Sequence, residues 1–187
     1  METIWFQQQL SDRFSMGLQL RNSGIRYRFV NARAIEEGNT LFIGVVVGLK
    51  VKESESYRLD FNLTTSYRRL QNDDKVELPE NTDGLEIDPN IIMTLPLNDR
   101  LFFHTGAMLR LAMQTGPESI GNEQGLSAIV LNGLSLRSGS NVFSLKTYAG
   151  PMNGATGDTE KFFWQVALSY QFSLSGKNSA SLPFFNF

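Results

Sequence analysis

Hydrophobic and polar residues alternate along most of this chain with a period of two. In the stretch 57–69, apolar residues such as Leu59 and Phe61 take one set of alternate positions, and polar residues such as Asp60 and Asn62 take the other. Successive side chains of a β-strand point to opposite faces, so this pattern predicts amphipathic strands and not helices. The stretch is about twice as long as the ~5–6 residues usual for a strand of a soluble protein.

The same alternation recurs in seven other stretches with varying regularity. They are 14–30, 41–52, 85–97, 101–114, 127–137, 143–149 and 162–174. In the first of them the phase changes at Asn22-Ser23-Gly24, which indicates either a β-bulge or a tight turn between two short strands. With 14–30 counted as one strand, the sequence predicts eight strands.

The connections between these stretches alternate in length. Short turns are expected at 52–56, 98–100 and 137–141, and long loops at 31–40, 72–84, 115–125 and 150–160. This order is typical of an all-β, antiparallel up-and-down barrel with both chain ends on the side of the short turns. We expect one barrel domain over 14–174. Residues 1–13 are interpreted as an N-terminal tail or an extra strand, and 175–187 as a C-terminal tail.

An amphipathic barrel can turn its apolar face inward, as a soluble lipocalin-like barrel does, or outward to lipid. Charges of both signs on the polar face favour the second arrangement, because they can pair inside a narrow lumen. The predicted lumen network consists of Lys50, Arg58, Asp60, Arg68, Glu86, Asp88, His104 and Arg110. Aromatic residues near the ends of the apolar stripes predict two membrane girdles. They are Tyr57, Tyr67, Phe162, Trp164, Tyr170 and Phe172. The sequence therefore predicts a transmembrane β-barrel.

Composition removes several other classes of function. The 187 residues include no cysteine, which excludes disulfides and cysteine-based metal sites. A net charge of −2 gives no generally basic surface for nucleic acid. The longest apolar run, 41–49, is far short of the ~20 residues of a membrane-spanning helix. We predict no metal and no cofactor.

The predicted long loops and their edges are strongly acidic. Only Arg33 and Lys75 offset their acidic residues, which are Glu36, Glu37, Asp73, Asp74, Glu77, Glu80, Asp83, Glu118, Glu123, Asp158 and Glu160. These loops lack the regular spacing of oxygen ligands of a calcium-binding loop. They are interpreted as a solvated surface that meets divalent cations.

The stretch Phe162-Phe163-Trp164-Gln165-Val166-Ala167-Leu168-Ser169-Tyr170-Gln171-Phe172 resembles the closing strand of bacterial outer-membrane proteins. The whole of 14–174 resembles the small eight-stranded barrels, such as the OmpA membrane domain, OmpX and OmpW-like proteins. The resemblance implies an outer-membrane location with periplasmic termini and extracellular long loops. It implies contact with outer-membrane lipid and lipopolysaccharide, and with the barrel-assembly machinery during biogenesis. The assembly signal usually ends the chain, whereas residues 173–187 follow here, so 182–187 is an alternative signal.

The sequence favours a non-enzymatic barrel with a structural, adhesive or partner-binding role through its acidic outer loops. One alternative is a narrow porin-like or hydrophobic-solute transporter, although an eight-stranded interior is just wide enough to be filled with side chains. Another is a lipid A-modifying enzyme with His104 as general base. That enzyme would need a serine and a carboxylate beside His104, and the carboxylates in reach would be Asp60 or Asp88 on other strands. We interpret His104 as a member of the polar lumen network.

Overall fold

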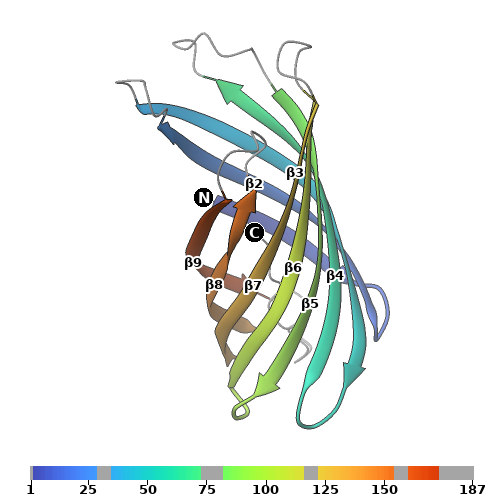
Figure 1. Cartoon of the computed structure of the whole chain (residues 1–187). Helices are drawn as coiled ribbons and strands as arrows, with labels where there is room; N and C mark the ends of the chain where they lie inside the picture. The colour runs from blue at the N-terminus through green and yellow to red at the C-terminus, as the bar shows by residue number, and fades with distance from the viewer. Residues whose placement is uncertain (1, 29–34, 73–81, 116–121, 154–159, 173–187) are drawn as a thin grey trace.

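The computed structural model describes residues 2–28, 35–72, 82–115, 122–153 and 160–172 of the chain. They form nine antiparallel strands, and each strand pairs with the next one along the sequence. The strands are β1 (Glu2–Gln9), β2 (Phe14–Arg28), β3 (Ile35–Glu53), β4 (Arg58–Asn72), β5 (Thr82–Pro96), β6 (Leu101–Thr115), β7 (Asn122–Ser138), β8 (Asn141–Asn153) and β9 (Glu160–Phe172). The sheet curls into a half-barrel (Figure 1). The prediction of an all-β, up-and-down antiparallel sheet is confirmed.

The described residues form nine strands and not eight, because residues 2–9 form β1, the extra strand that was one of the two interpretations of 1–13. Thr3 pairs with Arg21 and Gln9 with Ser15, so β1 and β2 make a regular hairpin. The stretch 14–28 is one strand with neither a turn nor a bulge at Asn22-Ser23-Gly24, because its pairing with β3 runs unbroken through these residues. The irregularity lies instead in the pairing of β3 with β4, between Lys50 and Lys52.

Several strands extend into stretches that were predicted to be loops. β3 begins at Ile35, β5 at Thr82 and β7 at Asn122, and β8 continues to Asn153. In these extensions the backbone pairs with a neighbouring strand, so the strand persists where the alternation of side chains has faded.

The four short turns lie at one edge of the half-barrel, toward the bottom of Figure 1. Three of them are capped by a side chain: Ser11 Oγ accepts from the Phe14 amide at 3.1 Å, Ser54 Oγ from the Tyr57 amide at 3.3 Å, and Asn98 Oδ1 from the Leu101 amide at 2.9 Å. The fourth turn, between β7 and β8, begins with Gly139 at φ 59°, the left-handed conformation that two-residue hairpin turns require. The remaining connections start from the opposite edge and consist of residues outside the described ranges.

Glycines on the inner face permit the curl of the sheet. A Cβ at Gly17 would lie 2.3 Å from the carbonyl oxygen of Phe6, and one at Gly106 would lie 2.1 Å from that of Ile91. Both contacts are with the backbone of the adjacent strand. A side chain at either position would therefore force the two strands apart and flatten the sheet.

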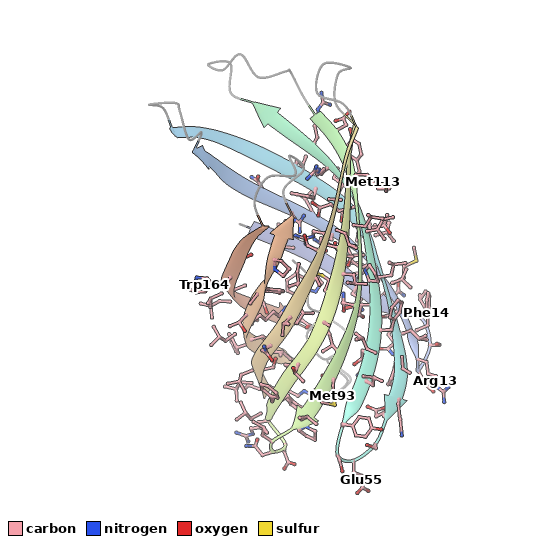
Figure 2. The ribbon with its side chains drawn as sticks, viewed as in Figure 1. Arg13, Phe14, Glu55, Met93, Met113 and Trp164 are labelled. Carbon is pink, nitrogen blue, oxygen red and sulfur yellow. The ribbon has the colours of Figure 1, made fainter. Side chains whose placement is uncertain are left out.

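The apolar face of the sheet is the outer one. Leu18 is 60% exposed, Trp164 74% and Leu168 84%, whereas inward-pointing polar residues such as Glu86 and Ser135 are buried. Figure 2 shows Trp164 and Phe14 pointing away from the sheet on opposite sides of the molecule. A soluble barrel with an apolar ligand inside would have the reverse arrangement.

The predicted girdle residues do not all lie on the strands. Tyr67, Trp164, Tyr170 and Phe172 are exposed on the outer face. Tyr57 lies in the turn between β3 and β4, where the Lys52 ammonium is 5.4 Å from the centre of its ring. The side chain of Phe162 lies outside the described residues. None of the described residues belongs to a helix that is long and apolar enough to span a membrane.

The edges of the sheet are β1 and β9, and no hydrogen-bonded pairing joins them in the described part of the chain. Nine is an odd number of strands, so β1 and β9 run in the same direction. The first residue of β1 therefore lies away from the short-turn edge, and the prediction of both chain ends on that side is wrong. The curl nevertheless brings β1 near β8, because the Lys146 ammonium lies 5.5 Å from the centre of the Trp5 ring.

Candidate functional site

The polar interior of the half-barrel is the candidate functional site, and it divides into three groups of side chains. The predicted lumen residues are distributed among these groups and do not form one network. An ion-pair layer lies toward the edge opposite the short turns, a hydroxyl–imidazole layer lies nearer the short turns, and two small ion pairs lie at the short-turn rim.

The ion-pair layer is centred on Glu86 of β5. Its carboxylate lies 2.9 Å from Arg21 Nη2, 3.6 Å from Arg68 Nη1 and 3.8 Å from Arg110 Nε. Arg110 also forms a two-point pair with Asp88, with Nε–Oδ1 and Nη2–Oδ2 distances of 3.1 Å. Three guanidinium groups and two carboxylates from β2, β4, β5 and β6 thus meet in one buried cluster.

Arg21 is the member of the ion-pair layer that the sequence prediction missed. It is buried on β2, and its guanidinium carbon lies 3.6 Å from the centre of the Phe42 ring. Alternation with Leu18 and Leu20 indicates its inward direction. The apparent change of phase at residues 22–24 hid this signal. Stacking on Phe42 and pairing with Glu86 hold the guanidinium between β3 and β5.

The hydroxyl–imidazole layer is centred on His104 of β6. Its Nδ1 lies 2.9 Å from Thr94 Oγ1, its Nε2 lies 2.7 Å from Ser135 Oγ, and Ser135 Oγ lies 2.9 Å from Ser144 Oγ. These residues come from β5, β6, β7 and β8. The carboxylates that the enzyme alternative would need, Asp60 and Asp88, have other partners: Asp60 pairs with Arg58 and Asp88 with Arg110.

A serine beside an imidazole is the pair from which a nucleophile is built, but its surroundings differ from those of a hydrolase triad. The second imidazole nitrogen faces the Thr94 hydroxyl, where a triad has a carboxylate that orients and stabilises the charged ring. His104 and Ser135 are each 1% exposed, which leaves no access for a substrate in this conformation. The arrangement instead joins four strands through consecutive hydrogen bonds.

An apolar cluster separates the two polar layers. It consists of Ile92, Met108, Ile129, Leu131 and Tyr148, contributed by β5, β6, β7 and β8. On β5 the inward-pointing residues, in order from the short turn, are Thr94, Ile92, Asn90, Asp88 and Glu86, so one apolar level lies between polar ones. The interior along these strands is therefore packed with side chains.

The rim pairs lie beside the turn between β3 and β4. Arg58 Nη2 is 2.7 Å from Asp60 Oδ1, and Lys50 Nζ is 2.6 Å from Glu53 Oε2. Lys50, Arg58 and Asp60 thus take no part in the ion-pair layer, contrary to the prediction of one network. Their side chains are partly exposed at the end of the sheet, where ion pairs contribute little to stability.

Lys146 of β8 is a further buried cation of the interior. The alternation of β8 places it on the inner face beside Ser144 and Tyr148. The predicted lumen network did not include it, although the alternation of 143–149 places it on the polar face. Its ammonium faces the Trp5 ring of β1.

The acidic residues of the predicted loops are only partly described. Glu36 and Glu37 lie in β3, Asp83 in β5, Glu123 in β7 and Glu160 in β9, so these five belong to strands. The other six, and the tail 175–187 with the alternative signal 182–187, lie outside the described ranges. Within the described part of the chain, no group of three or more His, Asp or Glu residues could hold a metal ion.

Comparison of this chain with protein-family models, with curated proteins and with solved structures finds no match.

Proposed function

We propose that this protein is a bacterial outer-membrane β-barrel that serves as a packed anchor and acts through the connections at the edge opposite the short turns. The observation that carries the proposal is the apolar outer face. On a monomeric soluble protein, contiguous exposed apolar patches rarely exceed a few hundred Å². Here exposed aliphatic and aromatic side chains cover the outside of all nine strands, from Ile4 on β1 to Phe172 on β9.

The dimensions of the apolar face support the proposal. Leu126 and Leu136 both point outward on β7 and are ten residues apart. At ~3.3 Å per residue and a strand tilt near 40°, they are about 25 Å apart along the axis, the height of the apolar band of a membrane barrel. Tyr170 lies near the short-turn boundary, and its hydroxyl donates to Asn141 Oδ1 at 2.7 Å. A tyrosine whose ring lies on the apolar outer face and whose hydroxyl is hydrogen-bonded is typical of a membrane interface.

In a sheet that spans a membrane, the backbone N–H and C=O groups of the two edge strands need hydrogen-bond partners. The proposal therefore requires β1 and β9 to pair. Unpaired backbone groups in hydrocarbon cost several kcal/mol each. In a closed barrel only β9 separates β8 from β1, which places β8 and β1 about 10 Å apart. The contact between Lys146 and Trp5 is what such an arrangement produces, and Ala167, the small register partner of Lys146 on β9, leaves room for it. Because β1 and β9 run in the same direction, the seam would be a parallel pair.

The packed interior favours an anchor over a channel. The ion-pair layer and the apolar cluster fill successive levels, and Leu131, Met108 and Glu86 are almost fully buried. A solute path would require these side chains to move. We therefore place a structural, adhesive or partner-binding role first, with the acidic connections facing the cell exterior, and transport second.

The first experiment is the mobility of detergent-folded protein on SDS gels, with unboiled and boiled samples compared. Closed membrane barrels keep their hydrogen-bonded sheet in SDS until heated, so we expect a heat-dependent shift. No shift, together with solubility in buffer without detergent, would contradict the proposal.

Orientation and permeability need separate tests. An epitope inserted within residues 73–81 should bind antibody on intact cells, whereas one in the turn between β1 and β2 should bind only after permeabilisation. Staining of the turn epitope on intact cells would reverse the proposed orientation. In planar bilayers we expect no conductance above background, and single-channel steps would favour the transport alternative.

A further inference from the structure

The outer face of β6, β7 and β8 has a row of polar side chains within its apolar surface. Thr105 pairs in register with Asn132, and Asn132 pairs with Thr147. Asn132 alternates with the exposed Val130 and Leu134, so its side chain points outward. The polar row is therefore on the face that we propose to contact lipid.

One donor group of the polar row, the side-chain NH2 of Asn132, has no acceptor within the described part of the chain. Thr105 Oγ1 donates to Asn132 Oδ1 at 3.0 Å, and Thr147 Oγ1 donates to the main-chain oxygen of Asn132 at 3.5 Å. Asn132 Nδ2 makes no hydrogen bond to any of the described residues. Two N–H groups thus project from the outer face, and a hydrocarbon environment would not satisfy them.

The polar row lies too deep for lipid headgroups to satisfy these N–H groups. Asn132 is four residues from Leu136 and six from Leu126, which mark the two ends of the apolar band on β7. These separations correspond to about 10 Å and about 15 Å along the barrel axis. Polar groups at such depth are rare and mark sites of interaction.

The surface around the polar row has small side chains on one side and a groove on the other. Its register neighbours on the next level are Ala107, Val130 and Ala149. Toward the short turns it borders a groove of about 470 Å³, lined by residues that include Leu134, Leu145, Leu168 and Tyr170. The corresponding face of β3 and β4 has Ile43, Val45 and Phe61, with larger side chains.

We infer that the outer face of β6, β7 and β8 is a dimer interface, in which Asn132 of one copy pairs with Asn132 of a second copy of this chain. The inference rests on the proposed membrane location. All copies enter a membrane with the same orientation, so a residue at a given depth meets the same residue of a copy related by a two-fold axis. The asparagine amide is both donor and acceptor, so each Nδ2 can donate to Oδ1 of the other copy. Small neighbours permit close approach, and the groove receives apolar side chains of the second copy.

Single-cysteine variants test the interface directly, since the chain has no cysteine of its own. Asn132→Cys is expected to form a disulfide-linked dimer in bilayers after addition of an oxidant. Thr65→Cys is the matched control, because Thr65 is also a polar residue that points outward but lies on β4, between Val45 and Ile87. Equal cross-linking of the two variants, or none of Asn132→Cys, would overturn the inference.

The amide itself is tested by Asn132→Leu, with Thr147→Val as a milder change. We expect the dissociation constant of the dimer in detergent to rise about tenfold for Asn132→Leu and about threefold for Thr147→Val. Both variants should keep the heat-dependent mobility shift of the original chain. An unchanged dissociation constant in shifted, folded protein would refute the interface alone. Absence of the shift in the original chain would instead refute the membrane barrel.

Discussion

The two polar layers of the interior share the strands β5 and β6 but differ in chemistry. β5 and β6 supply Glu86, Asp88 and Arg110 to the ion-pair layer, and Thr94 and His104 to the hydroxyl–imidazole layer. The first layer consists of full charges removed from water, and the second contains one imidazole and three hydroxyl groups. Charges are far more costly to bury unpaired than hydroxyls, so the loss of one partner should have unequal effects on the two layers.

Glu86→Ala should have the largest effect, because it removes the buried carboxylate that Arg21, Arg68 and Arg110 share. We expect the free energy of unfolding to fall by about 3–5 kcal/mol, as measured by urea titration of the folded protein in lipid vesicles. Asp12→Ala, in the exposed turn between β1 and β2, removes a carboxylate without burial and serves as control. Equal losses for the two variants would show that burial of the ion-pair layer is unimportant.

Removal of both members of a buried ion pair should lower the free energy of unfolding less than the two single substitutions together. The double variant Asp88→Leu/Arg110→Met is expected to be more stable than the sum of the two single variants predicts, by about 0.5–3 kcal/mol in a double-mutant cycle. Additive single effects would mean that the 3.1 Å contacts between these side chains carry no coupling.

His104→Leu should destabilise the protein less than Glu86→Ala does. The substitution removes two hydrogen bonds but leaves hydroxyl groups that can rotate and bond to each other, so we expect a loss of about 1–3 kcal/mol. The same urea titration measures it. A loss larger than that of Glu86→Ala would reverse the proposed ranking of the two layers.

Ser144→Ala should have the smallest effect, about 1 kcal/mol, because it deletes only the terminal bond of the hydroxyl–imidazole layer. Ser56→Ala, at an exposed turn position, is the comparison and should be close to zero. If the two serine variants behave alike, the bond between Ser135 and Ser144 contributes nothing measurable.

The sequence predicted the faces of the sheet better than the contacts within it. The period of two placed Glu86, Asp88 and Arg110 on one face, because side-chain direction in a strand follows from position alone. Partners depend on register across several strands. Arg21 and Glu86 are 65 residues apart with β3 and β4 between them, and no local pattern encodes that distance. β1 was left open as a tail or strand, because its alternation is short.

The turn between β5 and β6 explains why Thr94 lies beside His104. The turn after β5 is fixed by the side chain of Asn98, which accepts from two backbone amides. That turn sets the register in which Thr94 lies opposite His104. A shift of two residues in the register of this hairpin would have placed the apolar Ile92 beside the imidazole.

The strictly sequential pairing of the strands has a kinetic consequence. Every described pairing joins strands that follow one another in the chain, so the sheet can grow hairpin by hairpin, with short loops to close at the four tight turns. The union of β1 with β9 is the exception, because it would bring together segments about 150 residues apart and therefore carries the largest loop-closure entropy. We expect the rate of complete assembly to be limited by this last step, and an open sheet with a finished interior to be its precursor.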